Sequence, residues 1–161
     1  MLAMGNAMST FTAQNMGAGK IDRVKKGYRM CYVIVLTAGA VLCVMYQLAG
    51  GAFVSLFLDS GSSEAYSVGL SYVKFLSFFY SFIGLKASTD GLLRGAGDVT
   101  AFTVANLVNL AIRVSVTNLF APIYGIQVAW MAVPLGWAAN YVISFGWYLT
   151  GKWKKIRVIK K

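Results

Sequence analysis

The sequence contains no histidine and only five acidic residues among its 161 positions. Histidine is the commonest general base, so its absence excludes the usual Ser-His-Asp arrangement of hydrolases. The acidic residues also form no pair within an apolar segment, which is the setting that raises a carboxyl group into the range for acid–base catalysis. We therefore expect a protein that is not an enzyme.

Motifs that bind metals and nucleotides are missing as well. Cys31 and Cys43 are the only cysteines and lie twelve residues apart in one apolar segment, a spacing that predicts neither a disulfide framework nor a metal site. A Gly-Lys pair ends at residue 20, but a phosphate-binding loop would need a glycine at Gln14 and a hydroxyl residue at Ile21. No metal or nucleotide cofactor is expected.

Long uncharged stretches dominate the sequence. Residues 30–58 and residues 114–151 carry no charged side chain, which gives runs of 29 and 38 residues. A helix of about 20 mostly apolar residues crosses a hydrocarbon layer roughly 30 Å thick. Only 12% of the residues are charged and 58% are hydrophobic. This composition predicts an all-α fold, a bundle of helices that spans the lipid bilayer several times.

The net charge of +10 is concentrated beside the apolar runs. Eleven of the fifteen Lys and Arg residues lie in two clusters, residues 20–29 and 152–161. Basic segments next to membrane helices remain on the cytoplasmic side and meet anionic headgroups. This interpretation is favoured over nucleic-acid binding. It predicts a multi-pass protein of the cell membrane with a cytoplasmic C-terminus.

The hydrophobic pattern predicts a single transmembrane region with four complete spans and a partial helix. The spans cover about 30–52, 66–87, 101–120 and 128–150, and a basic tail follows at 152–161. Lys and Arg occur in segments 20–29 and 86–100, whereas 59–64 has two acids and no base and 121–127 is uncharged, so the sides alternate without conflict. The first helix, 1–16, is too short to span a bilayer, and we expect the chain to be a fragment.

Two spans have polar side chains at intervals of three and four residues, which places these side chains on one face of a helix. We expect these faces to meet protein or water, because charge in lipid is costly. Lys74 and Arg113 either contact a substrate or act as structural charges, and the asparagines either line a cavity or join helices. The candidates are Lys74, Ser77, Ser81, Asn106, Asn109 and Arg113. Pro134, in the last span, is expected to kink its helix for packing.

Two motifs carry a resemblance to a known family: "STFTAQNMGAGKIDRVKKG" at residues 9–27 and "DGLLRGAGD" at residues 90–98. With the contexts of Arg113 and Pro134, they make the chain resemble the multidrug and toxic compound extrusion (MATE) family of transporters. The motif residues are Gln14, Asn15, Gly17, Gly19, Asp90, Arg94, Gly95, Gly97 and Asp98. The two Gly-Ala-Gly segments suggest similar turns at the cytoplasmic side. We interpret the three charged residues of the second motif as helix-end pairs and caps rather than a proton relay.

The resemblance implies about twelve helices in two lobes, of which this chain matches an incomplete C-terminal lobe. It further implies export of organic, often cationic compounds driven by Na⁺ or H⁺, with the missing N-terminal half as partner. The middle of the third span has no acid, and Asp90 lies towards its cytoplasmic end, so the site of the coupling ion is expected outside this chain. A small non-transporting membrane protein is the alternative, and a homo-oligomeric transporter is a third possibility.

The predicted topology can be tested by labelling single cysteines in intact cells. Ser62→Cys should react with a membrane-impermeant reagent and Lys154→Cys should be protected, because basic segments stay in the cytoplasm. Both substitutions are placed in a background without Cys31 and Cys43. The opposite labelling pattern would overturn the topology.

Overall fold

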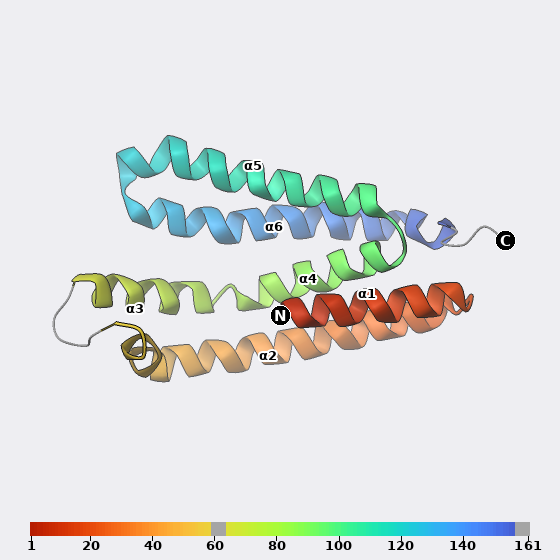
Figure 1. The fold of residues 1–161 in the computed structure, drawn as a ribbon, viewed down its shortest axis with the longest axis horizontal. Helices are drawn as coiled ribbons and strands as arrows, with labels where there is room; N and C mark the ends of the chain where they lie inside the picture. The colour runs from red at the N-terminus through yellow and green to blue at the C-terminus, as the bar shows by residue number, and fades with distance from the viewer. Residues whose placement is uncertain (59–63, 157–161) are drawn as a thin grey trace.

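The prediction of an all-α fold is confirmed by a computed structural model, which describes residues 1–58 and 64–156. Helices make up nearly all of this part of the chain (Figure 1). They are α1 (Leu2–Gly17), α2 (Ile21–Ser55), α3 (Glu64–Ser77), α4 (Tyr80–Gly95), α5 (Val99–Tyr124), α6 (Ile126–Thr150) and the 3₁₀ helix η1 (Lys152–Lys155).

Three of these helices, α2, α5 and α6, are long and apolar enough to cross a membrane. The pair α3 and α4 passes the same test together, although it is bent by 55°. The described residues therefore contain three candidate spans, or four if the bent pair crosses as one. Two predicted segments lie partly outside the described residues. These parts are 59–63 of the acidic segment and 157–161 of the basic tail.

The third predicted span, 66–87, is not one continuous helix. Helix α3 ends at Ser77 and α4 begins at Tyr80, although neither glycine nor proline stands at the break. Near the break, the carbonyl of Lys74 accepts hydrogen bonds from Gln47 Nε2 at 2.9 Å and from Ser77 Oγ at 2.7 Å. Gln47 of α2 thus bonds to both the backbone and a side chain at the end of α3.

Two predicted loops are shorter than expected. Helix α4 continues to Gly95, so much of segment 86–100 is helical, and α5 continues through Pro122 to Tyr124. Only Gly125 separates α5 from α6. Its φ is 85°, a backbone conformation that residues other than glycine rarely adopt. Proline removes one amide from the helix, and close to a helix end this does not terminate it.

The two Gly-Ala-Gly segments form the same turn, as the sequence suggests. Gly19 after α1 and Gly97 after α4 have φ values of 70° and 84°. In each turn the amide of the following residue donates to the carbonyl five residues earlier, at 2.8 Å and 2.9 Å. This is the Schellman ending of a helix. Both turns and η1 lie at the same end of the bundle, and the turn between α5 and α6 lies at the other (Figure 1).

Helix α1 lies directly against α4, beside α2 (Figure 1). A Cβ atom at Gly91 would overlap the carbonyl of Gly5, and one at Gly95 would overlap the carbonyl of Ser9. Small residues four positions apart are the usual device for close helix packing in membranes. The adjoining buried residues include Met8, Val24, Tyr28, Cys31, Val35, Leu92, Leu93, Ala96, Ala101 and Trp153.

The close contact between α1 and α4 predicts that Gly91→Leu destabilises the chain by about 1–3 kcal/mol, the usual effect of overpacking. Gly146→Leu is the matched control, because a Cβ atom at Gly146 meets nothing within 4 Å. Unfolding midpoints of both variants in detergent compare the two positions. Equal midpoints would show that α1 does not pack on α4 in this way.

Candidate functional site

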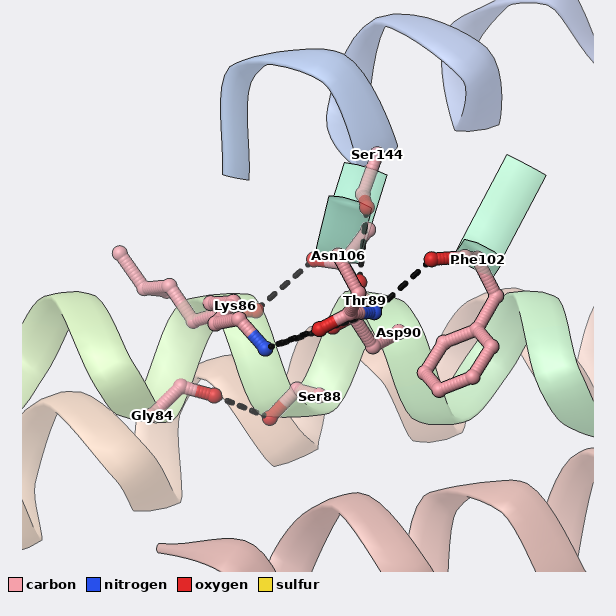
Figure 2. A network of polar contacts seen from close by, with 9 residues as sticks. Gly84, Lys86, Ser88, Thr89, Asp90, Phe102, Asn106 and Ser144 are labelled. Carbon is pink, nitrogen blue, oxygen red and sulfur yellow. Dashed lines mark hydrogen bonds and ion pairs between the residues drawn. The ribbon is translucent and has the colours of Figure 1, made fainter. Parts of the chain in front are cut away.

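A buried carboxylate on α4 is the centre of the candidate site. Asp90 is only 4% exposed, and both of its oxygens have partners from other turns or helices. Oδ1 accepts from Ser144 Oγ on α6 at 2.7 Å. Oδ2 accepts from Lys86 Nζ at 2.9 Å and from Asn106 Nδ2 on α5 at 3.2 Å. Figure 2 shows these side chains converging from three helices.

Lys86 and Asn106 complete the network around this carboxylate. Lys86 Nζ also donates to Asn106 Oδ1 at 3.0 Å, and Asn106 Nδ2 donates to the carbonyl of Phe102 at 2.8 Å. The side chains of Lys86 and Asp90 are 14% and 6% exposed. An unpaired ion would cost several kcal/mol at such burial. The network balances the two charges and supplies neutral hydrogen bonds to both.

The order of the ion pair along α4 argues against a simple role in helix stability. A lysine four residues before an acid is the weaker arrangement on an isolated helix, since the pair then opposes the helix dipole. The pair instead obtains partners from α5 and α6. The ion pair therefore joins α4 to its neighbouring helices.

A groove of about 300 Å³ runs beside the network between α1, α4 and α5. Its polar and aromatic lining is formed by Asn6, Lys86, Asp90, Arg94, Phe102 and Asn106. At 1.5 Å per residue, Asp90 lies about 10 Å and Lys86 about 16 Å along the helix from Gly97.

Arg94 does not pair with Asp90, although the two lie four residues apart. Its Nη2 donates to Asn6 Oδ1 at 2.8 Å and its Nε to Ser9 Oγ at 3.4 Å, both on α1. The guanidinium also lies 5.7 Å from the centre of the Phe102 ring, within the range of a cation–π contact. Arg94 thus holds α1 and α5 at the rim of the groove.

Asp98, at the second glycine turn, caps a helix as the sequence suggests. Its Oδ1 accepts from the amide of Ala101 at 3.2 Å, which satisfies the start of α5. Its Oδ2 accepts from Trp147 Nε1 on α6 at 2.7 Å. Residues of the first motif have local roles at the end of α1: Asn15 Nδ2 donates to the carbonyl of Phe11 at 2.7 Å, while Gln14 and Gly17 are exposed.

The polar face of the third predicted span does not join this network. Ser77 is buried at the break and accepts from Gln47 Nε2 at 3.0 Å. The half-buried Lys74 lies beside Gly50, and Ser81 lies against Gly39. All three candidates therefore contact α2 rather than the groove between α1, α4 and α5.

Asn109 and Arg113 lie farther along α5 and pack on Gly136 of α6. Asn109 is buried, yet its Oδ1 has no hydrogen-bond partner among the described residues. Asn140 is 0% exposed, and neither polar atom of its side chain has such a partner there. Arg113 is exposed on this chain and lines a pocket of about 350 Å³. Helix α6 continues through the buried Pro134 without a break.

Several residues of the site are not predicted from the sequence. Lys86 and Asp90 are four residues apart, which would place them on one face of a helix. The prediction of a loop over segment 86–100 hides this relation. Ser144 gives no signal, because single serines are common in apolar helices. A second polar cluster is also missed, in which Thr89 Oγ1 lies 2.7 Å from the hydroxyl of Tyr28 and 2.9 Å from that of Tyr32.

Comparison with known proteins identifies the family. The sequence model of the MatE family matches residues 1–135. The chain belongs to the MatE family. This confirms the resemblance to MATE proteins, which are transporters and not enzymes. As a MatE chain with apolar helices, it is a multi-pass membrane protein.

Two curated relatives come from Bacillus subtilis (strain 168). "Probable multidrug resistance protein YpnP" is 28% identical, over 98% of this chain and 35% of its own length. "Probable multidrug resistance protein YoeA" is 23% identical, over 99% of this chain and 34% of its own length. The MatE chain therefore spans about a third of the length of these relatives.

A solved structure shares the fold. It is described as the "Inward-facing conformation of a multidrug resistance MATE family transporter of the MOP superfamily" and superposes with a TM-score of 0.80 at 17% identity. The match covers 91% of this chain and 33% of that chain. The helices described above are thus arranged as in part of a MATE transporter.

The buried ion pair predicts strong coupling in a double-mutant cycle. Lys86→Met and Asp90→Asn should each destabilise the chain by about 3–5 kcal/mol, because each leaves a buried charge without its partner. The double variant should lose less stability than the sum of the losses in the two single variants. Unfolding free energies in detergent give the coupling.

The exposed ion pair of α2 is the matched control for this cycle. Lys25 Nζ lies 2.9 Å from Asp22 Oδ1, with side-chain exposures of 38% and 88%. Lys25→Met and Asp22→Asn should show no measurable coupling. Coupling of equal size in the two cycles would contradict the burial of the Lys86–Asp90 pair.

Proposed function

We propose that this chain forms the C-terminal part of a cation-coupled multidrug exporter, in which a Na⁺ or H⁺ gradient drives efflux of organic, often cationic compounds. The observation that carries the proposal is the buried Asp90 network beside a groove between α1, α4 and α5. Ionisable side chains inside a membrane protein usually mark a transport pathway. The family and the names of both relatives point to the same activity.

The groove has the chemistry to receive an organic compound. Asn6 and Asn106 supply amides, and Phe102 supplies an aromatic face. Pockets for small molecules combine an apolar lining with a few placed polar groups in this way. The groove is therefore the contribution of this chain to the substrate pathway.

A second lobe is the proposed partner of this chain. Secondary transporters work by rocking two repeats around a site between them, and this chain covers about a third of its relatives. Arg113 lies near the middle of α5 and would cost about 2.5–3.5 kcal/mol in lipid by insertion scales. Its exposure on this chain supports a position against protein or water in the complete transporter.

The orientation follows from the basic residues at one end of the bundle. The start of α2 and helix η1 are rich in lysine and lie together with the α4–α5 turn (Figure 1). By the positive-inside rule this end faces the cytoplasm, so we propose that the C-terminus is cytoplasmic. The same lysines can meet anionic lipid headgroups.

Export is tested with a chimera of a relative in cells that lack their own drug exporters. The C-terminal third of YpnP is replaced by this chain, and resistance to ethidium and efflux of ethidium are measured beside intact YpnP. We expect the chimera to export ethidium, and the Asp90→Asn chimera to lose export even when its rate is divided by the amount of protein in the membrane. The 161 residues alone should give no resistance, because their polar faces need partner helices.

Lys25→Met is the control in the chimera, since it removes an exposed charge. Export by the Asp90→Asn chimera at the rate of the unmodified chimera would reject the groove as part of the pathway. Strong export by the 161 residues alone would reject the need for a second lobe and favour a homo-oligomer.

A further inference from the structure

We infer that the Lys86 ammonium is the resident cation of the Asp90 site and excludes Na⁺ and other inorganic monovalent cations from it. The inference rests on the proposed export function and names a residue that determines which ions the site accepts. It follows from three observations: the oxygens that hold Lys86, the charge of the network, and the attachment of the lysine to the same helix as its carboxylate.

The first observation is the set of oxygens around the ammonium. Lys86 Nζ lies 2.9 Å from Asp90 Oδ2 and 3.0 Å from Asn106 Oδ1. Carboxylate and amide carbonyl oxygens are the ligands that hard cations prefer. Asp90 Oδ1 lies on the same carboxylate, held by Ser144. An inorganic cation would need the oxygens that the ammonium now occupies.

The second observation is the charge of the network. Asp90 and Lys86 are the two charged members, and the amide of Asn106 and the hydroxyl of Ser144 are neutral. The network is therefore balanced as it stands. A further cation beside Lys86 would meet like charge in a buried setting, where screening by water is weak.

The third observation is the tether. Lys86 and Asp90 lie one helical turn apart on α4, a continuous helix in this region. A ligand attached so closely has a high effective concentration that does not depend on the solution. Free Na⁺ at cellular concentrations therefore competes poorly with the lysine. This places the binding site of the coupling ion outside the Asp90 network.

The test is equilibrium binding of ²²Na⁺ to the purified chain in lipid nanodiscs, with choline as the balancing cation. The unmodified chain should show no saturable binding, whereas Lys86→Met should bind Na⁺ at least about tenfold more tightly, because a competing positive charge is gone. Adding Asp90→Asn to Lys86→Met should abolish this binding. The unfolding midpoint of Lys86→Met should rise with Na⁺ and not with choline.

Two variants serve as controls. Lys86→Arg keeps a positive charge at the site and should bind no Na⁺. Lys74→Met removes the lysine of α3, which contacts α2 instead of the network, and should behave as the unmodified chain. If Lys86→Met does not fold, Lys86→Gln removes the charge and keeps a hydrogen-bond donor for Asp90.

The inference is overturned if the unmodified chain binds Na⁺ as tightly as Lys86→Met. It is also overturned if folded Lys86→Met and Lys86→Gln bind no Na⁺. The assay requires no transport, so its outcome is separate from that of the export experiment. Gain of Na⁺ binding together with an inactive chimera would reject export and retain the role of Lys86.

Discussion

The carboxylate of Asp90 sets the arrangement of the helices around α4. A buried charge must be paired and hydrogen-bonded, or it destabilises the fold by several kcal/mol. Lys86 supplies the opposite charge from the same helix, while Asn106 and Ser144 bring α5 and α6 to hydrogen-bonding distance. One acidic side chain therefore links α4 to both of these helices.

The rest of the bundle fits around this constraint. The next residue, Gly91, begins the glycine face of α4 that lets α1 approach its backbone, so one helix carries a polar contact on one side and a close apolar contact on another. Asp98 forms a second carboxylate contact between helices at the end of the bundle, where it joins the turn after α4 to Trp147 of α6. A groove between α1, α4 and α5 remains beside the network, which is where we place the substrate pathway.

The sequence predicts those features that depend on local chemistry. Uncharged runs indicate the spans, and the glycines of the two motifs indicate the Schellman turns. The break after Ser77 is not predictable in this way, because neither glycine nor proline marks it and its partner Gln47 lies on another helix. The role of Lys86 likewise depends on Asn106 of α5, a partner that no spacing along the chain reveals. Sequence reasoning thus finds Asn106 as a polar position but not the ion pair it completes.

The most direct test of the central claim is a solid-state NMR measurement on the chain in lipid. Dipolar coupling between ¹⁵N at lysine Nζ and ¹³C at aspartate Cγ reports ion pairs, and the Asp90→Asn variant assigns the signal. We predict a contact at hydrogen-bonding distance that involves Lys86, disappears in Asp90→Asn and persists in Asp22→Asn. A spectrum that is identical in the unmodified chain and in Asp90→Asn would show that the pair does not form, and would contradict this account of the fold and of the site.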